Sequence, residues 1–269
     1  MEKLNRFVAK HLMPLYWIGV IVWIFAISIP ANRYDMPAVV QFFLYIAGFF
    51  LWIRFLGSRA RTLLREPVKI FLEQCNPYPF LEEIRKHKTY SGSKATKLNL
   101  LISETTAMID IGECQEVYIL LSPKENDMKA TLMRSLLMSY YCQMATVCRK
   151  LQKDQEAEIW FQKALEAYGK IKNQKQKKQF EDVALMHDAW VFFERGQYSS
   201  TLQLLAQITP ENMRSRVSLS MSYAAVYLAQ KDTEKAKEAL TFVAENGNKL
   251  YIATQARQML AEIEETTLA

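Results

Sequence analysis

Four cysteines, three histidines and two groups of neighbouring glutamates are the side chains of this sequence best suited to nucleophilic, acid–base or metal chemistry. They are Cys75, Cys114, Cys142, Cys148, His11, His87, His187, Glu82, Glu83, Glu262, Glu264 and Glu265. The cysteines form no CxxC pair and have no histidine at a metal-site spacing. We therefore expect them to be buried thiols of a reducing compartment, and the glutamates to lie on exposed helix faces.

Motifs that build active sites are missing as well. The sequence contains no phosphate-binding glycine loop, no HExxH and no GxSxG. Without titratable groups that converge on one place, we predict that the protein is not an enzyme and has no catalytic residue, no cofactor and no metal site. An enzyme with an unrecognised site is the least favoured alternative.

The elements that must position any site are predicted to be helices. The chain has 269 residues, half of them hydrophobic, which is enough to bury a substantial core. It has only 8 glycines and few alternating stretches typical of strands. The composition thus predicts an all-α protein.

Two apolar stretches near the N-terminus are long enough to cross a bilayer. Residues 12–29 contain no charge, and residues 37–53 contain only Gln41 as a strongly polar group. We predict a two-span membrane hairpin over residues 1–56. A cleaved signal peptide is the alternative for the first stretch, but its apolar run is longer than usual and a second span follows. Because neither stretch contains an ionisable residue, an anchor is favoured over a transporter.

Positive charge is concentrated around these stretches. Residues 1–69 hold nine Lys/Arg and three Asp/Glu, which leaves 25 of each sign in the remaining 200 residues. The flanks are basic and the loop between the spans is not, so the hairpin is predicted to lie in the plasma or inner membrane with both termini cytoplasmic. The balanced remainder argues against nucleic-acid binding.

A basic segment follows the second stretch, and anionic lipid head groups are its expected contact. Its residues are Arg54, Arg59, Arg61, Arg65 and Lys69. These cations also determine topology, so lipid binding is not required to explain them. A second basic run, Lys170 to Phe180, is favoured as a solvated connection or an extended helix, with lipid binding as the alternative.

Three segments of the C-terminal part share one spacing of small and large residues. A small residue recurs, then another after twelve positions, a large apolar residue four further on, and an apolar residue three beyond that. The four sets are Ala145, Ala189 and Ala224; Ala157, Thr201 and Ala236; Phe161, Leu205 and Leu240; Ala164, Ile208 and Val243. This spacing predicts antiparallel helix pairs that approach closely at the small residues.

The spacing resembles the tetratricopeptide repeat, with Gly196 and Tyr198 at the turn positions of the clearest unit. The resemblance implies an α-solenoid of helical hairpins over residues 96–269 with a C-terminal capping helix, preceded by a basic juxtamembrane and helical linker over residues 57–95. The other two units depart from the pattern, because Gln152 and Lys231 replace the turn glycine.

The first helices of such a solenoid line a concave groove that binds segments of other proteins. The groove residues expected from the register are Thr146, Arg149, Lys150, Met186, Trp190, Phe193, Glu194, Met221, Ala225, Leu228 and Ala229. The alternative is that the chain's own closing helix or core covers them. A clamp for a C-terminal carboxylate is not expected, because Thr146, Trp190 and Ala225 occupy the positions of its asparagines.

These features together predict a membrane-anchored, cytoplasm-facing scaffold that binds other proteins. A homo-oligomer is compatible with this reading. The alternative is a membrane sensor or complex subunit whose two spans pair with other membrane helices.

Overall fold

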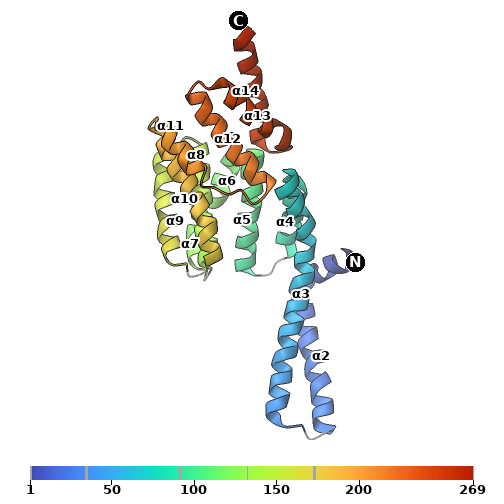
Figure 1. Ribbon diagram of the computed structural model, residues 1–269. Coiled ribbons are helices and arrows are strands. Elements are labelled where there is room, and N and C mark those ends of the chain that lie inside the picture. Colours follow the sequence, from blue (N-terminus) through green and yellow to red (C-terminus); the bar gives the residue numbers. More distant parts are fainter. Residues whose placement is uncertain (1, 34–35, 91–92, 132, 172–173, 269) are drawn as a thin grey trace.

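The computed structural model describes residues 2–33, 36–90, 93–131, 133–171 and 174–268. These residues form helices joined by short connections, without a strand, as the composition predicts (Figure 1). The helices are α1 (Glu2–Lys10), α2 (Leu12–Arg33), α3 (Ala38–Gln74), α4 (Tyr78–Tyr90), α5 (Lys94–Ile111), α6 (Cys114–Leu121), η1 (Ser122–Lys124), α7 (Glu125–Lys129), α8 (Arg134–Lys150), α9 (Asp154–Gly169), α10 (Gln174–Glu194), α11 (Tyr198–Leu205), α12 (Met213–Ala229), α13 (Thr233–Asn246) and α14 (Tyr251–Leu268).

Helices α2 and the first half of α3 form an antiparallel hairpin that projects from the helical body (Figure 1). By length and composition, Ala38–Arg59 of α3 could cross a membrane, with 11% of its most apolar stretch buried in the protein. The apolar part of α2, Pro14–Pro30, is shorter. Thus one of the two expected spans meets the length and composition required of a membrane helix.

Each helix of this hairpin places a tryptophan over a glycine of the other. A Cβ on Gly48 would lie 1.7 Å from the Trp23 indole, and one on Gly19 would lie 1.9 Å from the Trp52 indole. The indole nitrogen of Trp23 donates to the Leu44 carbonyl at 3.1 Å, and that of Trp52 donates to the Leu15 carbonyl at 3.2 Å. The two contacts are reciprocal, and small residues permit them by letting the helices approach closely.

Helix α3 continues beyond the apolar segment without interruption into the helical body. The domain boundary expected at residues 56/57 lies inside α3, and the one expected at 95/96 lies two residues after the start of α5. The expected connection at residues 170–180 is mostly helical, because α10 begins at Gln174, while residues 172–173 lie outside the described part.

Helix pairs α8/α9, α10/α11 and α12/α13 contain the shared register of small residues. Ala145, Ala189 and Ala224 are buried on the first helices, and Ala157, Thr201 and Ala236 are buried on the second. At the third register position Phe161, Leu205 and Leu240 are also buried. Because the alanines and the threonine of the first two positions have small side chains, the two helices of a pair can pack closely.

The turns of these pairs, and that between α5 and α6, share one geometry. Gly112, Gln152, Gly196 and Lys231 all have a positive φ between 58° and 94°. In each turn the next residue's N–H donates to the carbonyl five positions earlier, as Lys153 does to Cys148 at 2.8 Å and Asp232 to Tyr227 at 2.9 Å. This is the Schellman ending of a helix, which favours glycine at the left-handed position.

Replacing Lys231 with glycine should therefore stabilise the protein. Lys231 is exposed at φ 59°, a conformation that strains a residue with a Cβ. We expect Lys231→Gly to raise the free energy of unfolding by about 0.5–1 kcal/mol, measured by urea denaturation. The neighbouring Gln230 has a right-handed conformation, so Gln230→Gly should lower that free energy by a similar amount. Equal effects of the two substitutions would contradict this account.

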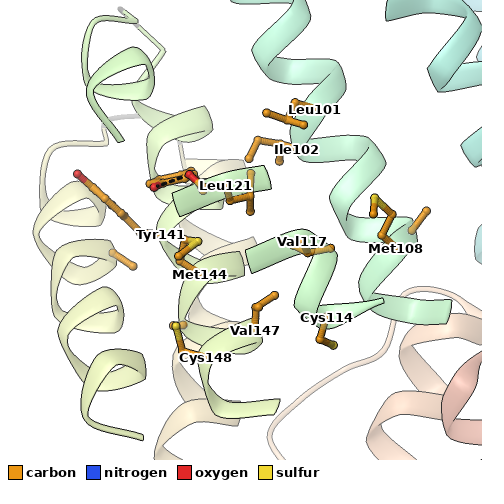
Figure 2. Packing of buried hydrophobic residues seen from close by; sticks show 14 of the residues in the cluster. Leu101, Ile102, Met108, Cys114, Val117, Leu121, Tyr141, Met144, Val147 and Cys148 are labelled. Atoms are coloured by element: carbon orange, nitrogen blue, oxygen red, sulfur yellow. Dashed lines mark hydrogen bonds between the residues drawn. The ribbon is translucent and has the colours of Figure 1, made fainter. Parts of the chain in front are cut away.

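The main core extends from α3 to α14, and Figure 2 shows the part of it between α5, α6 and α8, where apolar side chains point toward one another. Val117 and Leu121 of α6 are fully buried against Met144 and Val147 of α8. The buried Tyr140 hydroxyl donates to the Leu121 carbonyl at 3.2 Å, which satisfies its polar atom in the core. The α5/α6 hairpin is thus packed onto the first of the three register-bearing pairs.

The last helices return to the end of α3. Arg214 of α12 forms a bidentate ion pair with Asp110 of α5, and its guanidinium lies 5.1 Å from the Phe71 ring of α3. The Asn248 side chain and the Lys249 amide donate to the last carbonyls of α3 and its cap, at 2.8 and 3.2 Å. The helix that leaves the apolar hairpin is therefore joined directly to the C-terminal pairs.

Candidate functional site

An open cavity of about 550 Å³ lies on the inner side of α8, α10 and α12. Helix α14 adds Ile252 and Gln255 to its wall, and helix α11 adds Thr201 and Leu205. The remaining lining residues are Thr146, Arg149, Lys150, Met186, Ala189, Trp190, Phe193, Ser218, Met221, Ser222, Ala225 and Val226. Concave sites of this size, with apolar walls and a few polar groups, are typical of ligand binding.

Most of the residues expected in the groove line this one cavity. Thr146, Arg149, Lys150, Met186, Trp190, Phe193, Met221 and Ala225 do so. Leu228, Glu194 and Ala229 are not among its lining residues. Leu228 is half-buried against the main core instead, because the end of α12 meets other helices of the body.

The closing helix does not fill the cavity. Helix α14 packs on α13 and contacts α5 and α12, yet Trp190 remains 38% exposed. Phe193 packs beside Trp190, with ring centroids 5.7 Å apart, and is half-buried together with Met186 and Met221. The cavity therefore presents an apolar wall to solvent, which usually marks an interaction site.

Arg149 is held at the edge of this wall by two aromatic neighbours. Its Nη2 lies 3.0 Å from Nδ1 of His187, and its guanidinium lies 5.7 Å from the Trp190 ring. His187 is buried and stacked on Phe161 at 3.5 Å. Burial and then the neighbouring Arg149 lower the pKa of His187, so the neutral imidazole accepts the hydrogen bond from Arg149.

Sequence reasoning missed His187 and the two residues of α14. His187 directly follows Met186 and faces Phe161 of the preceding pair, a contact that the spacing within one pair does not reveal. Ile252 and Gln255 reach the cavity only because α14 folds back over the preceding helices. The available sequence signal was the position of this histidine, two residues before the small residue Ala189 at the predicted helix crossing.

Three of the four cysteines have strongly raised pKa values. Burial raises the pKa of Cys75 and Cys148 to about 11 and the pKa of Cys142 to about 12, so these thiols stay protonated at neutral pH. Within the described residues, no cluster of His, Cys, Asp or Glu could hold a metal ion. The site offers hydrogen bonding, apolar contact and positive charge.

The expected lipid-facing cations lie along α3 beyond its apolar segment. Arg54, Arg65 and Lys69 are exposed, and Arg59 is half-buried with its guanidinium 5.2 Å from the Phe55 ring. The side chain of Arg61 lies outside the described part of the chain. The described cations thus lie in α3 at or beyond the C-terminal end of its apolar segment and are not among the residues that line the cavity.

No family model matches this sequence, and comparisons with curated proteins and with solved structures return no match.

Proposed function

We propose that the chain is an α-solenoid of tetratricopeptide-like hairpins attached to a two-span membrane hairpin. The solenoid is supported by the shared Schellman turns and by the buried small residues of successive pairs. Phe161 of α9 stacks on His187 of α10, and Leu205 of α11 packs with Leu219 of α12, so successive pairs contact one another as they do in repeat arrays. The pairs α8/α9, α10/α11 and α12/α13 carry the repeat, and α14 is its cap.

We place α2 and the apolar segment Ala38–Arg59 of α3 in the membrane. Support comes from the large apolar side chains that they leave exposed, among them Phe25, Ile29, Phe43 and Leu51, each more than 60% exposed. Water would disfavour so large an apolar surface, whereas lipid accommodates it. The indole N–H groups of Trp23 and Trp52 donate to backbone carbonyls within the hairpin, so these two polar groups are satisfied in lipid without a partner from another protein.

Both ends of the chain should lie in the cytoplasm. Lys3, Arg6 and Lys10 precede the first span and the basic segment follows the second, so the positive-inside bias holds both flanks on that side. A phosphatase that is active only outside the cytoplasm, fused after Ala269, should be inactive. The same phosphatase inserted between residues 34 and 35 should be active. The reverse pattern would contradict the proposed orientation.

The function supported best is the binding of other proteins at the membrane surface. The observation that carries it is that Met186, Trp190, Phe193 and Met221 come from two successive pairs and line one open cavity with Arg149. Apolar anchors of this kind supply most of the binding energy in protein interfaces. The hairpin confines the cavity to the membrane, where a bound partner gains effective concentration.

Replacing Trp190 and Phe193 together with alanine should abolish partner capture. Two aromatic anchors are each worth about 2 kcal/mol or more, so we expect partner recovery to fall at least tenfold. The measurement is a crosslinking pull-down from native membranes with the tagged full chain, scored by quantitative mass spectrometry. Ile159→Ala is the matched control, because Ile159 is 57% exposed on α9 and is not among the cavity's lining residues. Unchanged recovery with unchanged helicity would remove the cavity as the binding site.

A sensor or complex subunit is the second candidate. The observation that favours it is the direct connection between α3 and the C-terminal pairs through Arg214 and Phe71. A displacement of the membrane helix would reach α12, which also lines the cavity. If partners instead bind to the spans, capture would survive the Trp190 and Phe193 substitutions, so the same pull-down separates the two candidates.

A further inference from the structure

The charged residues that line the cavity have one sign. Arg149 and Lys150 are among its lining residues, and no aspartate or glutamate is, within the described residues. The hydroxyls of Thr146, Ser218 and Ser222 supply further polar groups. The site is thus complementary to an anionic ligand with an apolar part.

Arg149 is the cation best placed to select such a ligand. Within the described part of the chain it has no carboxylate within 4.0 Å, and the carboxylates of Glu194, Glu158 and Asp154 act on it only from further away. Burial lowers its pKa, but a guanidinium stays charged at neutral pH. A half-buried cation without a close counter-ion is energetically unfavourable, and a bound carboxylate would relieve that cost.

The guanidinium is also oriented in advance. The hydrogen bond to His187 uses Nη2, and the Trp190 ring lies against the group, so the side chain has lost much of its freedom before a ligand arrives. A guanidinium has five N–H donors and binds carboxylates through two of them at once. His187 accepts a hydrogen bond from one of these N–H groups, so the other N–H groups remain available to a ligand.

A second cavity, of about 470 Å³, adjoins the first and shares Thr146, Arg149, Met186 and Ser218 with it. Its wall contains charges of both signs, including Lys178, Asp182 and Glu211. Arg149 therefore lies between two hollows that follow the inner faces of α8, α10 and α12. An extended chain that passes over Arg149 fits this shape better than one compact molecule.

We propose that the cavity binds a partner-protein segment in which an aspartate or glutamate stands next to a large apolar side chain. Arg149 binds the side-chain carboxylate, and Trp190, Phe193, Met186 and Met221 contact the apolar side chain. This inference rests on the proposed protein-binding function and adds the chemistry of the partner. It differs from recognition of a chain-terminal carboxylate, since the bound carboxylate belongs to a side chain.

The test is a selection of random 12-residue peptides, displayed with both ends blocked by fusion, on the full chain in detergent micelles. Wild type, Arg149→Gln and the Trp190→Ala/Phe193→Ala variant are compared after circular dichroism has shown equal helicity. Wild type should enrich peptides with Asp or Glu beside Leu, Phe or Trp. Arg149→Gln should lose the acidic preference and bind a labelled wild-type consensus peptide about tenfold more weakly, which corresponds to one charge-assisted hydrogen-bonded contact.

Two further variants keep the outcome decisive. Arg149→Lys keeps the positive charge but lacks the planar set of N–H donors, and it should bind with intermediate affinity. Arg216→Gln removes an exposed cation outside the cavity and should bind like wild type. Enrichment on wild type without an acidic preference would overturn this inference and leave the proposed function intact. No enrichment beyond that on the Trp190→Ala/Phe193→Ala variant would overturn both.

Discussion

Arg214→Met should lower the free energy of unfolding by about 2–3 kcal/mol. The substitution removes the bidentate partner of Asp110, whose side chain is only 15% exposed, and leaves that carboxylate without its counter-ion. It also removes the contact of the guanidinium with Phe71. Because α3, α5 and α12 meet at this point, the end of α3 and the C-terminal helix pairs should unfold less cooperatively with each other. The measurement is urea unfolding of the full chain in micelles, followed by circular dichroism.

Two variants test the physical reason for that loss. Arg216→Met lies two residues further along α12 and removes an exposed guanidinium whose contact with the Phe242 ring, at 5.4 Å, is similar to that of Arg214 with Phe71. It should change the free energy of unfolding by less than about 1 kcal/mol. Adding Asp110→Leu to Arg214→Met should recover most of the stability, since an apolar pair often replaces a buried ion pair at little cost. If Arg214→Met alone matched wild type, the ion pair would not join these helices.

Gly48→Leu should separate the two helices of the membrane hairpin. Any Cβ at this position would overlap the Trp23 indole at 1.7 Å, so the ring must move and its hydrogen bond to the Leu44 carbonyl is lost. Overpacking of this kind costs about 1–3 kcal/mol or more. We expect backbone amides of α2 to exchange with deuterium at least tenfold faster in micelles, while those of α8 and α9 are unchanged.

Gly169→Leu is the matched control, because a Cβ there would meet no atom within 4 Å. It should leave exchange in α2 unchanged. Adding Trp23→Ala to Gly48→Leu should restore part of the protection, since the smaller side chain leaves space for the leucine. Slow exchange in Gly48→Leu alone would show that the indole is not packed against this glycine.

Local patterns of the sequence predicted much of the helical body and of its cavity. The spacing that places Ala189 and Thr201 at a helix crossing also places Trp190 and Phe193 on the inner face of α10, because helical periodicity links the two faces. This reasoning did not place Leu228, because contacts from distant helices decide the environment of the end of α12. The same limit applies to Ile252, whose position depends on how α14 folds back.

The pairing of α2 with α3 also has a sequence signal, which the length and hydropathy of the two stretches do not reveal. Leu-Tyr-x-x-Gly-x-x-x-Trp occurs twice, as Leu15 to Trp23 and as Leu44 to Trp52. In the structure each tryptophan covers the glycine of the other copy and donates to its leucine carbonyl. The repeat alone does not say which residues meet, because the antiparallel arrangement is needed to bring them together.

Site-specific photocrosslinking in living cells tests most directly that the cavity binds another protein. A benzophenone amino acid replaces Lys150, an exposed residue of the cavity, or Ile159, an exposed residue of α9 outside it. We predict a discrete protein adduct from position 150 that is absent from position 159 and is lost in the Trp190→Ala/Phe193→Ala variant. The same adducts from both positions, or an adduct at 150 that survives the double substitution, would contradict the account.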